Sequence, residues 1–274
     1  MNTSFADIEK KENRKDLIIS ICVFLSGFSC FAQLYYFQPL LPDLAKDFIL
    51  SASESSFAIS FSTLGMVFGL FTTMFVADRI PRKKMIGTGL LSSSIFSVAA
   101  SFSPTFLPLI LLSAAKGFLL SGATSVSMAY IAEEVSSRNK GKIMGLYIAG
   151  NALGGMAGRV ISSWIGALYT WRIASVSIGL ICALFAILFL LFSPRSTNFM
   201  PRKESFHTLI IANLQLITSK ALIPFYLTGG LILGVFVSLY NYLGFYLTKA
   251  PFNFPEHYIP VSYTHLRAHE TELH

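Results

Sequence analysis

The sequence predicts an all-α, polytopic helical membrane protein, and its composition, its apolar runs and its charge placement are the observations that predict it. Of its 274 residues, 53% are hydrophobic and 13% charged, and the mean hydropathy is +0.61. A soluble domain usually carries about 25% charged residues. Long uncharged runs recur along the whole chain, which is typical of a multi-pass protein rather than a globular domain with one anchor.

Seven apolar runs are long enough to cross a bilayer, because a transmembrane helix needs about 20 residues. They cover residues 17–41, 55–77, 85–103, 105–131, 143–169, 172–192 and 221–247. Connectors as short as Ser103-Pro104 require neighbouring helices to run antiparallel. Residues 1–16 form a leader of mixed charge, and the apolar run after it is too long for the core of a cleavable signal.

The basic residues indicate which helix ends face the cytoplasm. Lys and Arg gather in the leader, in the connector between the second and third runs, in the connector between the fourth and fifth runs, and in the stretch after the sixth run. Since cytoplasmic loops carry an excess of these residues, the N-terminus is predicted to be cytoplasmic. The net charge of +7 is therefore explained by membrane topology, and we expect no nucleic-acid partner. The three cysteines lie within apolar runs, as small buried hydrophobic residues do.

The chain divides at the longest connector. Residues 17–192 are predicted to form a six-helix transmembrane domain, and residues 193–220 a cytoplasmic inter-domain linker. Phe206, Ile210, Leu214 and Ile217 share one helical face within that linker, which favours a helix lying in the membrane interface. Residues 221–259 would begin a second transmembrane domain with the seventh helix.

We expect residues 260–274 to be a non-native tail, since they resemble a peptide produced when sequencing-adapter DNA is translated. His265 and His269 have i, i+4 spacing there, but two histidines do not complete a metal site. We therefore predict no metal and no cofactor.

The strongest local motif is residues 74–84, Met-Phe-Val-Ala-Asp-Arg-Ile-Pro-Arg-Lys-Lys. It resembles the loop pattern G-x-L-x-D-R-x-G-R-K of the major facilitator superfamily. The matching positions are Asp78, Arg79, Arg82 and Lys83. Met74 and Pro81 replace the two glycines, which affects the approach of a neighbouring helix and the turn but not the charges. The resemblance implies a cytoplasmic latch between two halves; the alternative, a positive-inside signal, would need the basic residues but not Asp78.

Two cations, Lys116 and Arg159, fall inside apolar runs. Lys116 lies about 16 Å along its helix from Thr105, and an unpaired charge near mid-membrane costs about 2.5–3.5 kcal/mol on insertion scales. No Asp or Glu falls well inside any of the seven runs. Either a second half supplies carboxylates, or an anionic group on the substrate is attracted. We expect both cations to line a cavity for substrate or coupling.

Three further residues are cavity candidates. Gln33, Tyr36 and Asn241 lie toward the outer ends of the first and seventh runs, and ligand pockets pair aromatic walls with a few polar groups. For Tyr36 an interfacial aromatic belt is slightly favoured over the cavity, whereas Gln33 and Asn241 favour the cavity.

Glycines predict close helix packing in two runs. The fifth run contains Gly150, Gly154 and Gly158 at spacing four, with Gly155 between them. The second run has a shorter version, Gly65 and Gly69. Small residues at this spacing let two helix backbones approach each other. The fifth run resembles the glycine-rich motif of antiporters in the same superfamily; the alternative is a tight helix pair without a role in coupling.

Taken together, residues 17–259 resemble the drug and sugar efflux branch of the major facilitator superfamily, and within it the YnfM-like group of bacterial transport proteins. Besides the motifs above, the resemblance rests on the runs at 34–42, 128–134 and 239–244. It implies twelve helices in a bacterial inner (plasma) membrane, a small-molecule site between two six-helix halves, and proton-coupled efflux by an antiporter that works by alternating access. It also implies a monomer with no enzymatic activity.

Two other classes of membrane protein are excluded by residues that the sequence lacks, and two alternatives stay open. A seven-helix retinal receptor would need a Lys in the middle of the seventh helix, and the seventh run has none there. An intramembrane hydrolase would need a His within a membrane span, and no His lies inside any of the seven runs. A passive facilitator of the same fold and a non-transporting membrane fragment stay open. Because the sequence ends soon after the seventh run, we expect a truncated chain that does not transport alone.

Overall fold

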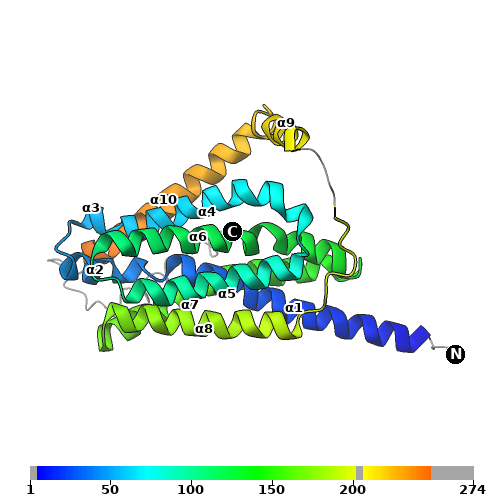
Figure 1. Cartoon of the computed structure of the whole chain (residues 1–274), viewed down its shortest axis with the longest axis horizontal. Coiled ribbons are helices and arrows are strands. Elements are labelled where there is room, and N and C mark those ends of the chain that lie inside the picture. Colours follow the sequence, from blue (N-terminus) through cyan, green and yellow to red (C-terminus); the bar gives the residue numbers. More distant parts are fainter. Residues whose placement is uncertain (1–4, 202–205, 248–274) are drawn as a thin grey trace, which may run out of the picture.

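Seven long helices dominate the computed structural model, which describes residues 5–201 and 206–247. They are α1 (Phe5–Tyr35), α4 (Phe57–Val76), α5 (Arg82–Ser101), α6 (Phe106–Glu134), α7 (Lys140–Leu168), α8 (Trp171–Phe192) and α10 (Ile223–Leu247). Each coincides with one of the seven predicted apolar runs, so the predicted fold class is confirmed. Helices α1 and α4 to α8 lie side by side as a bundle along the long axis (Figure 1).

The first helix differs from its prediction at both ends. It begins at Phe5, so most of the predicted leader is helical and continuous with the first span. It ends at Tyr35 rather than near residue 41, and the chain continues through the 3₁₀ turn η1 (Gln38–Leu40) into α2 (Leu41–Asp47). A proline at the start of each short helix explains the break, since proline removes a backbone donor and fixes φ.

Three further short elements complete the chain. A capping box starts α3 (Ala52–Ser55): the Ser51 hydroxyl accepts from the backbone N–H of Glu54, and the Glu54 carboxylate accepts from that of Ser51. The 3₁₀ turn η2 (Ala77–Arg79) connects α4 to α5. Helix α9 (Phe206–Ile217) lies where an amphipathic helix was predicted and contacts α4 at the edge of the bundle (Figure 1).

Among the described residues, four helical stretches have both the length and the hydropathy of a membrane span: Glu12–Asp47, Ala52–Arg79, Phe106–Glu134 and Trp171–Phe192. Helices α5 and α7 are less apolar because their inward faces carry serine and glycine. Helix α5 packs against α6 and α8, and α7 packs against α1 and α8. Ser93, Ser94 and Ser97 of α5 are fully buried, so this polarity faces other helices.

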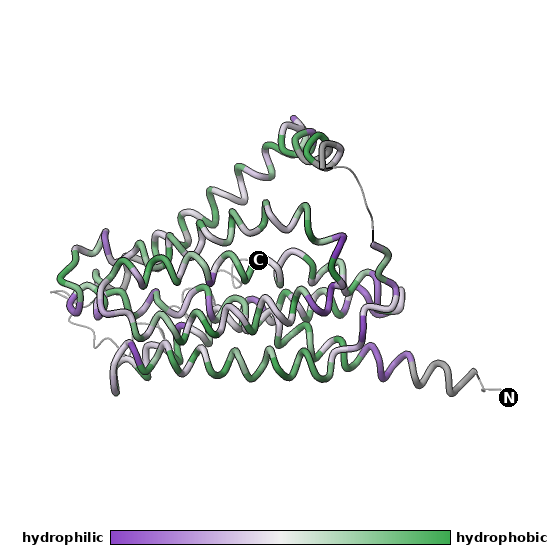
Figure 2. The backbone as a smooth tube through the Cα atoms, viewed as in Figure 1, coloured by the Kyte–Doolittle hydropathy of each residue, from purple (hydrophilic) through white to green (hydrophobic). Residues whose placement is uncertain are grey.

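Most residues along the helices of the bundle are hydrophobic (Figure 2). Phe68, Leu180 and Leu191 expose 59–69% of their surface, as expected of side chains that face lipid rather than water. The charged corner between α4 and α5, the α6–α7 connector and the start of α1 lie at one end of the bundle (Figures 1 and 2). That is the end for which a cytoplasmic location is predicted.

Helix α10 contacts the bundle at η1 and α2 and diverges from it along its length (Figure 1). Residues 248–259 of the predicted second domain and the predicted non-native tail, 260–274, lie outside the described residues. The domain division itself stays a prediction.

Candidate functional site

Lys116 occupies the centre of a buried site within α6. Its side chain is 1% exposed, and within the described residues its amine has no hydrogen-bond partner. The amine lies over two aromatic rings, 4.5 Å from the centroid of Tyr36 and 4.9 Å from that of Phe37. Desolvated cation–π contacts contribute about 2 kcal/mol, which offsets part of the burial cost of the charge without an ion pair.

Arg159 lies in a second buried position, on α7, and is 8% exposed. Its Nε donates to Gln38 Oε1 at 2.5 Å, and one terminal nitrogen donates to the carbonyl of Gly155 at 2.8 Å. Its guanidinium also lies 4.5 Å from the ring centroid of Tyr35. Neutral oxygens and an aromatic face thus hold this cation in place.

Gln33 and Tyr36 are both fully buried. Ser97 donates to Gln33 Oε1 at 3.2 Å, while Nε2 of Gln33 has no partner among the described residues. The Tyr36 hydroxyl is 2.8 Å from the Ser175 hydroxyl, which donates in turn to the carbonyl of Ser97. Tyr36 therefore belongs to an interior polar network rather than to an interfacial belt.

One short segment, residues 35–38 at the end of α1, contacts both cations. Tyr36 and Phe37 face Lys116, and Tyr35 and Gln38 face Arg159. The structure thus brings three of the five predicted cavity residues together here, namely Tyr36, Lys116 and Arg159. Gln33 lies three residues before Tyr36 and bonds to Ser97 instead, and Asn241 lies on α10 with its side chain outside the described residues. Sequence reasoning missed Phe37, because an apolar residue in an apolar run carries no signal of its own.

The glycines pack helices within the same half. A Cβ added at Gly150, Gly154 or Gly158 would collide with the backbone of α1. A Cβ at Gly65 or Gly69 would collide with the backbone of α6. Close backbone approach therefore joins α1 to α7 and α4 to α6. Gly155 differs from the others, since its carbonyl accepts from Arg159.

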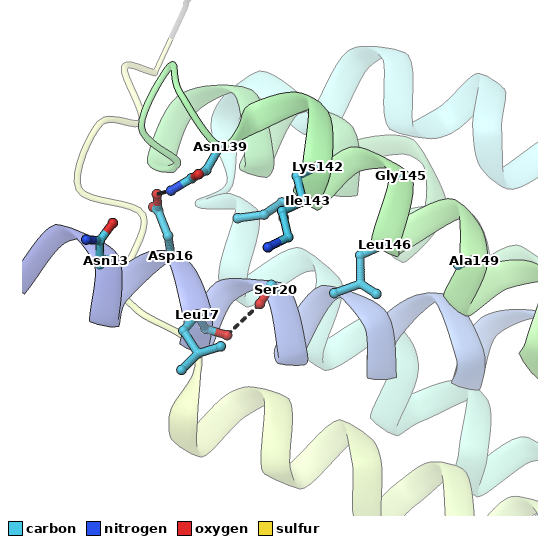
Figure 3. Close-up of a pocket in the computed structure, with 10 residues that line it drawn as sticks. All are labelled: Asn13, Asp16, Leu17, Ser20, Asn139, Lys142, Ile143, Gly145, Leu146 and Ala149. Carbon is cyan, nitrogen blue, oxygen red and sulfur yellow. Dashed lines mark hydrogen bonds between the residues drawn. The ribbon is translucent and has the colours of Figure 1, made fainter.

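A cavity of about 540 Å³ lies between α1 and α7 near the end of the bundle that holds the N-terminus (Figure 3). Sequence reasoning did not identify it. Its walls come from the first turns of α7 and from the part of α1 where the predicted leader meets the first span.

The predicted latch residues lie at the α4–α5 corner. Arg82 pairs with Asp78 at 2.9 Å and with Glu133, at the end of α6, at 3.1 Å. The amine of Lys83 donates to the carbonyl of Ser193. Arg79 is exposed. Asp78 and Arg82 therefore form one ionic cluster with Glu133, while Lys83 binds the segment that follows α8.

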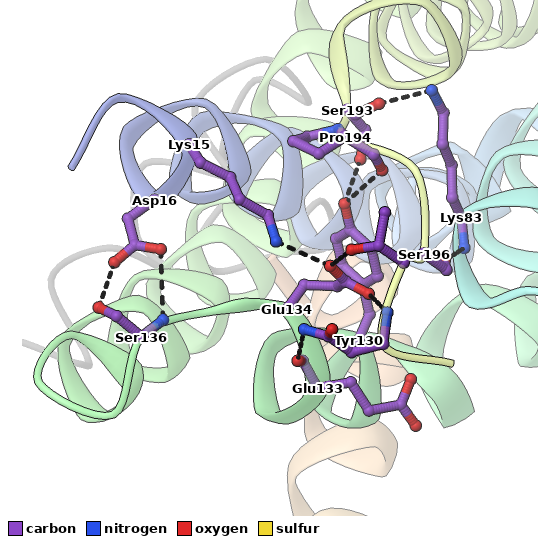
Figure 4. A network of polar contacts seen from close by, with 12 residues as sticks. Lys15, Asp16, Lys83, Tyr130, Glu133, Glu134, Ser136, Ser193, Pro194 and Ser196 are labelled. Atoms are coloured by element: carbon purple, nitrogen blue, oxygen red, sulfur yellow. Dashed lines mark hydrogen bonds and ion pairs between the residues drawn. The ribbon is translucent and has the colours of Figure 1, made fainter. Parts of the chain in front are cut away.

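That segment, residues 193–199, is bound across the end of the bundle (Figure 4). Glu134, whose side chain is fully buried, accepts from Lys15 at 2.8 Å, from the Thr197 hydroxyl at 2.8 Å and from the Asn198 backbone at 2.7 Å. The Tyr130 hydroxyl donates to the carbonyl of Pro194. These contacts were not predicted, because the partners are 63 or more residues apart in sequence.

Comparison with known proteins decides the family. The Major Facilitator Superfamily pattern matches residues 20–264. The chain belongs to the major facilitator superfamily. The proteins of this family are multi-pass membrane transporters of small molecules.

Its relatives are bacterial. The chain is 35% identical over 245 residues to an uncharacterized transporter of Buchnera aphidicola subsp. Schizaphis graminum, covering 89% of this chain and 59% of that protein. It is 35% identical over 236 residues to the inner membrane transport protein YnfM of Escherichia coli K12, covering 86% of this chain and 56% of YnfM. The chain thus spans somewhat more than half the length of these relatives.

Solved structures share the fold at low identity. A bacterial homologue of the human lysosomal transporter Spinster, in an inward-facing, unoccupied conformation, superposes with a TM-score of 0.75 at 14% identity, over 91% of this chain and 58% of that one. A D-xylose–proton symporter gives 0.68 at 15% identity, over 89% and 64%. At these identities the likeness concerns the fold alone.

Proposed function

We propose that this sequence works as part of a secondary active transporter that exports small molecules by alternating access, in exchange for protons. It would act as a monomer in a bacterial inner membrane, with its N-terminus in the cytoplasm. YnfM is an inner membrane transport protein, which supports the location. The asymmetric basic residues support the orientation.

The observation that carries the proposal is the buried amine of Lys116. It is 1% exposed and has no hydrogen-bond acceptor within the described residues. A buried ionisable group without a counter-charge is stabilised when it gains an anionic partner or loses its proton. If the substrate and a proton compete for the amine of Lys116, the transporter couples the movement of the substrate to the movement of protons.

The α4–α5 corner supports alternating access. Arg82, which is buried, forms an ionic cluster with the partly exposed Asp78 and Glu133 at one end of the bundle, where a second half would approach. Charge-assisted pairs of this kind are geometrically specific and can exchange partners between two conformations. We propose that Asp78, Arg79, Arg82 and Lys83 act as the latch.

Transport in everted membrane vesicles tests the proposal, in a full-length transporter that carries this sequence. A pH gradient across the vesicle membrane first quenches the fluorescence of a pH-sensitive dye. Organic anions and neutral drugs are then added one at a time, and a compound that restores the fluorescence is used as the substrate in the experiments below. Lys116→Ala should lower proton-driven transport at least tenfold. Unchanged transport with unchanged pH dependence in Lys116→Ala would show that Lys116 has no part in coupling.

Lys116→Arg separates the two possible roles of the charge. Arginine keeps the cation but does not release its proton in proteins. If Lys116 carries the proton, this variant should retain substrate counterflow and lose proton-driven accumulation. Lys84→Ala, an exposed cation at the start of α5, is the matched control and should behave like the unmodified protein.

A passive facilitator is the second candidate, and the aromatic contacts of Lys116 favour it. Rings 4.5 and 4.9 Å away stabilise a permanent cation, which would attract an anionic substrate without titrating. On this alternative, substrate flux leaves a preformed pH gradient intact, and Lys116→Arg transports normally.

A further inference from the structure

The cavity between α1 and α7 combines one free cation with an apolar wall. Lys142 lines it, together with the polar side chains of Asn13, Ser20 and Asn139. Lys142 is exposed, and no ion pair to it occurs within the described residues. In Figure 3 its side chain extends from α7 across the cavity toward α1.

The one carboxylate in the cavity wall is already bound. Asp16 accepts from the hydroxyl of Ser136 at 2.5 Å (Figure 4) and from the side-chain amide of Asn139 at 2.8 Å (Figure 3). It is 5% exposed, so its charge is directed into the α6–α7 connector. Lys142 is the one cation among the residues that line the cavity, and the bound Asp16 does not pair with it.

The deeper side of the cavity is apolar and continues along the outside of the bundle. Leu17 and Leu146, which line it, are 60% and 37% exposed. Ile21 lies one helical turn beyond Leu17 and is 52% exposed, and Leu153 lies two turns beyond Leu146 and is 43% exposed. Gly145 adds room, since a Cβ there would meet nothing within 4 Å.

We propose that this cavity binds an anionic phospholipid, with the phosphate held by Lys142 and the acyl chains lying along the groove between α1 and α7. The cavity lies at the end of the bundle, where lipid headgroups meet a membrane-spanning helix. A basic pocket between transmembrane helices at that depth matches an anionic headgroup, and apolar side chains below it match hydrocarbon. The proposal requires neither proton coupling nor a particular substrate.

Native mass spectrometry of the detergent-purified full-length transporter that carries this sequence tests the site. The protein is incubated with palmitoyl-oleoyl phosphatidylglycerol or with the phosphatidylcholine of the same chains, and bound lipid is counted. We expect more of the anionic lipid to bind. Lys142→Gln should lower its occupancy about fivefold, the effect of one basic residue near a lipid surface, and leave the zwitterionic lipid unchanged.

Three further variants keep the test decisive. Gly145→Leu fills the cavity without touching a charge and should lower the occupancy of the anionic lipid as well. Lys142→Arg should restore binding, and Lys84→Gln, an exposed cation on α5 outside the cavity, should match the unmodified chain. Equal binding of the two lipids, or equal losses in Lys142→Gln and Lys84→Gln, would overturn the proposal and indicate general surface attraction.

Discussion

At the scale of single residues, the glycine spacing and the buried cations show what a local pattern carries. Gly150, Gly154 and Gly158 predict a close helix contact from their spacing alone, and the structure places all three against α1. Lys116 is conspicuous in the sequence because it is charged. The contact of Lys116 with Tyr36 and Phe37 could not be predicted, because these residues are 79 or more positions away in the sequence.

Replacing Gly154 by alanine should destabilise the α1–α7 pair. The added Cβ would collide with the backbone of Phe28, and backbone cannot move aside as a flexible side chain can. Overpacking of this kind costs about 1–3 kcal/mol, so thermal unfolding in detergent should occur at a lower temperature.

Gly145→Ala is the control for that measurement. It lies in the same helix with open space around it, and alanine favours helix by about 1 kcal/mol over glycine. Its unfolding temperature should stay the same or rise. Equal unfolding temperatures for Gly154→Ala and the unmodified chain would contradict the proposed backbone contact.

At the scale of elements, the segment 193–199 shows why a linker predicted from composition can be ordered. Its polar residues look like a solvated connector in the sequence. In the structure Thr197 and Asn198 bind Glu134, and Ser196 accepts from the backbone N–H of Lys83 in the first turn of α5. Such partners come from distant helices, so no local period or spacing reveals them.

Glu134→Gln should loosen this segment. The variant loses the ion pair with Lys15 and weakens the bond from the Asn198 amide. Because hydrogen bonds to charged groups contribute about 1.5–3 kcal/mol, hydrogen–deuterium exchange over residues 193–199 should become about tenfold faster or more. Glu54→Gln, at the α3 capping box, should leave that exchange unchanged; no acceleration in Glu134→Gln would refute the anchoring role.

At the scale of the whole molecule, most of the architecture could be predicted from the sequence. The seven apolar runs, their antiparallel connections and their charge asymmetry follow from the hydrophobic effect and bilayer thickness. The break after Tyr35 was missed even though Pro39 and Pro42 are visible, because the run stays apolar through it. The ionic cluster of Arg82 was predicted only through Asp78, since Glu133 lies on another helix.

Site-directed labelling tests the orientation. Lys84→Cys and Arg138→Cys place thiols at the α4–α5 corner and the α6–α7 connector, and Tyr169→Cys places one at the opposite end, where Tyr169 is 67% exposed. The native cysteines are buried, so their background should be low. A membrane-impermeant maleimide added to whole cells should label only the Tyr169 variant. Labelling of Lys84→Cys and Arg138→Cys on different sides of the membrane would be incompatible with this arrangement.

The four residues that close α1 have a consequence for how charge reaches the interior. Because Tyr35, Tyr36, Phe37 and Gln38 are consecutive, a shift of the backbone at the end of α1 moves all four, and between them they contact two cations on two different helices. A displacement of this one stretch would hydrate both cations together. Access of water to the two sites would then be a single event rather than two.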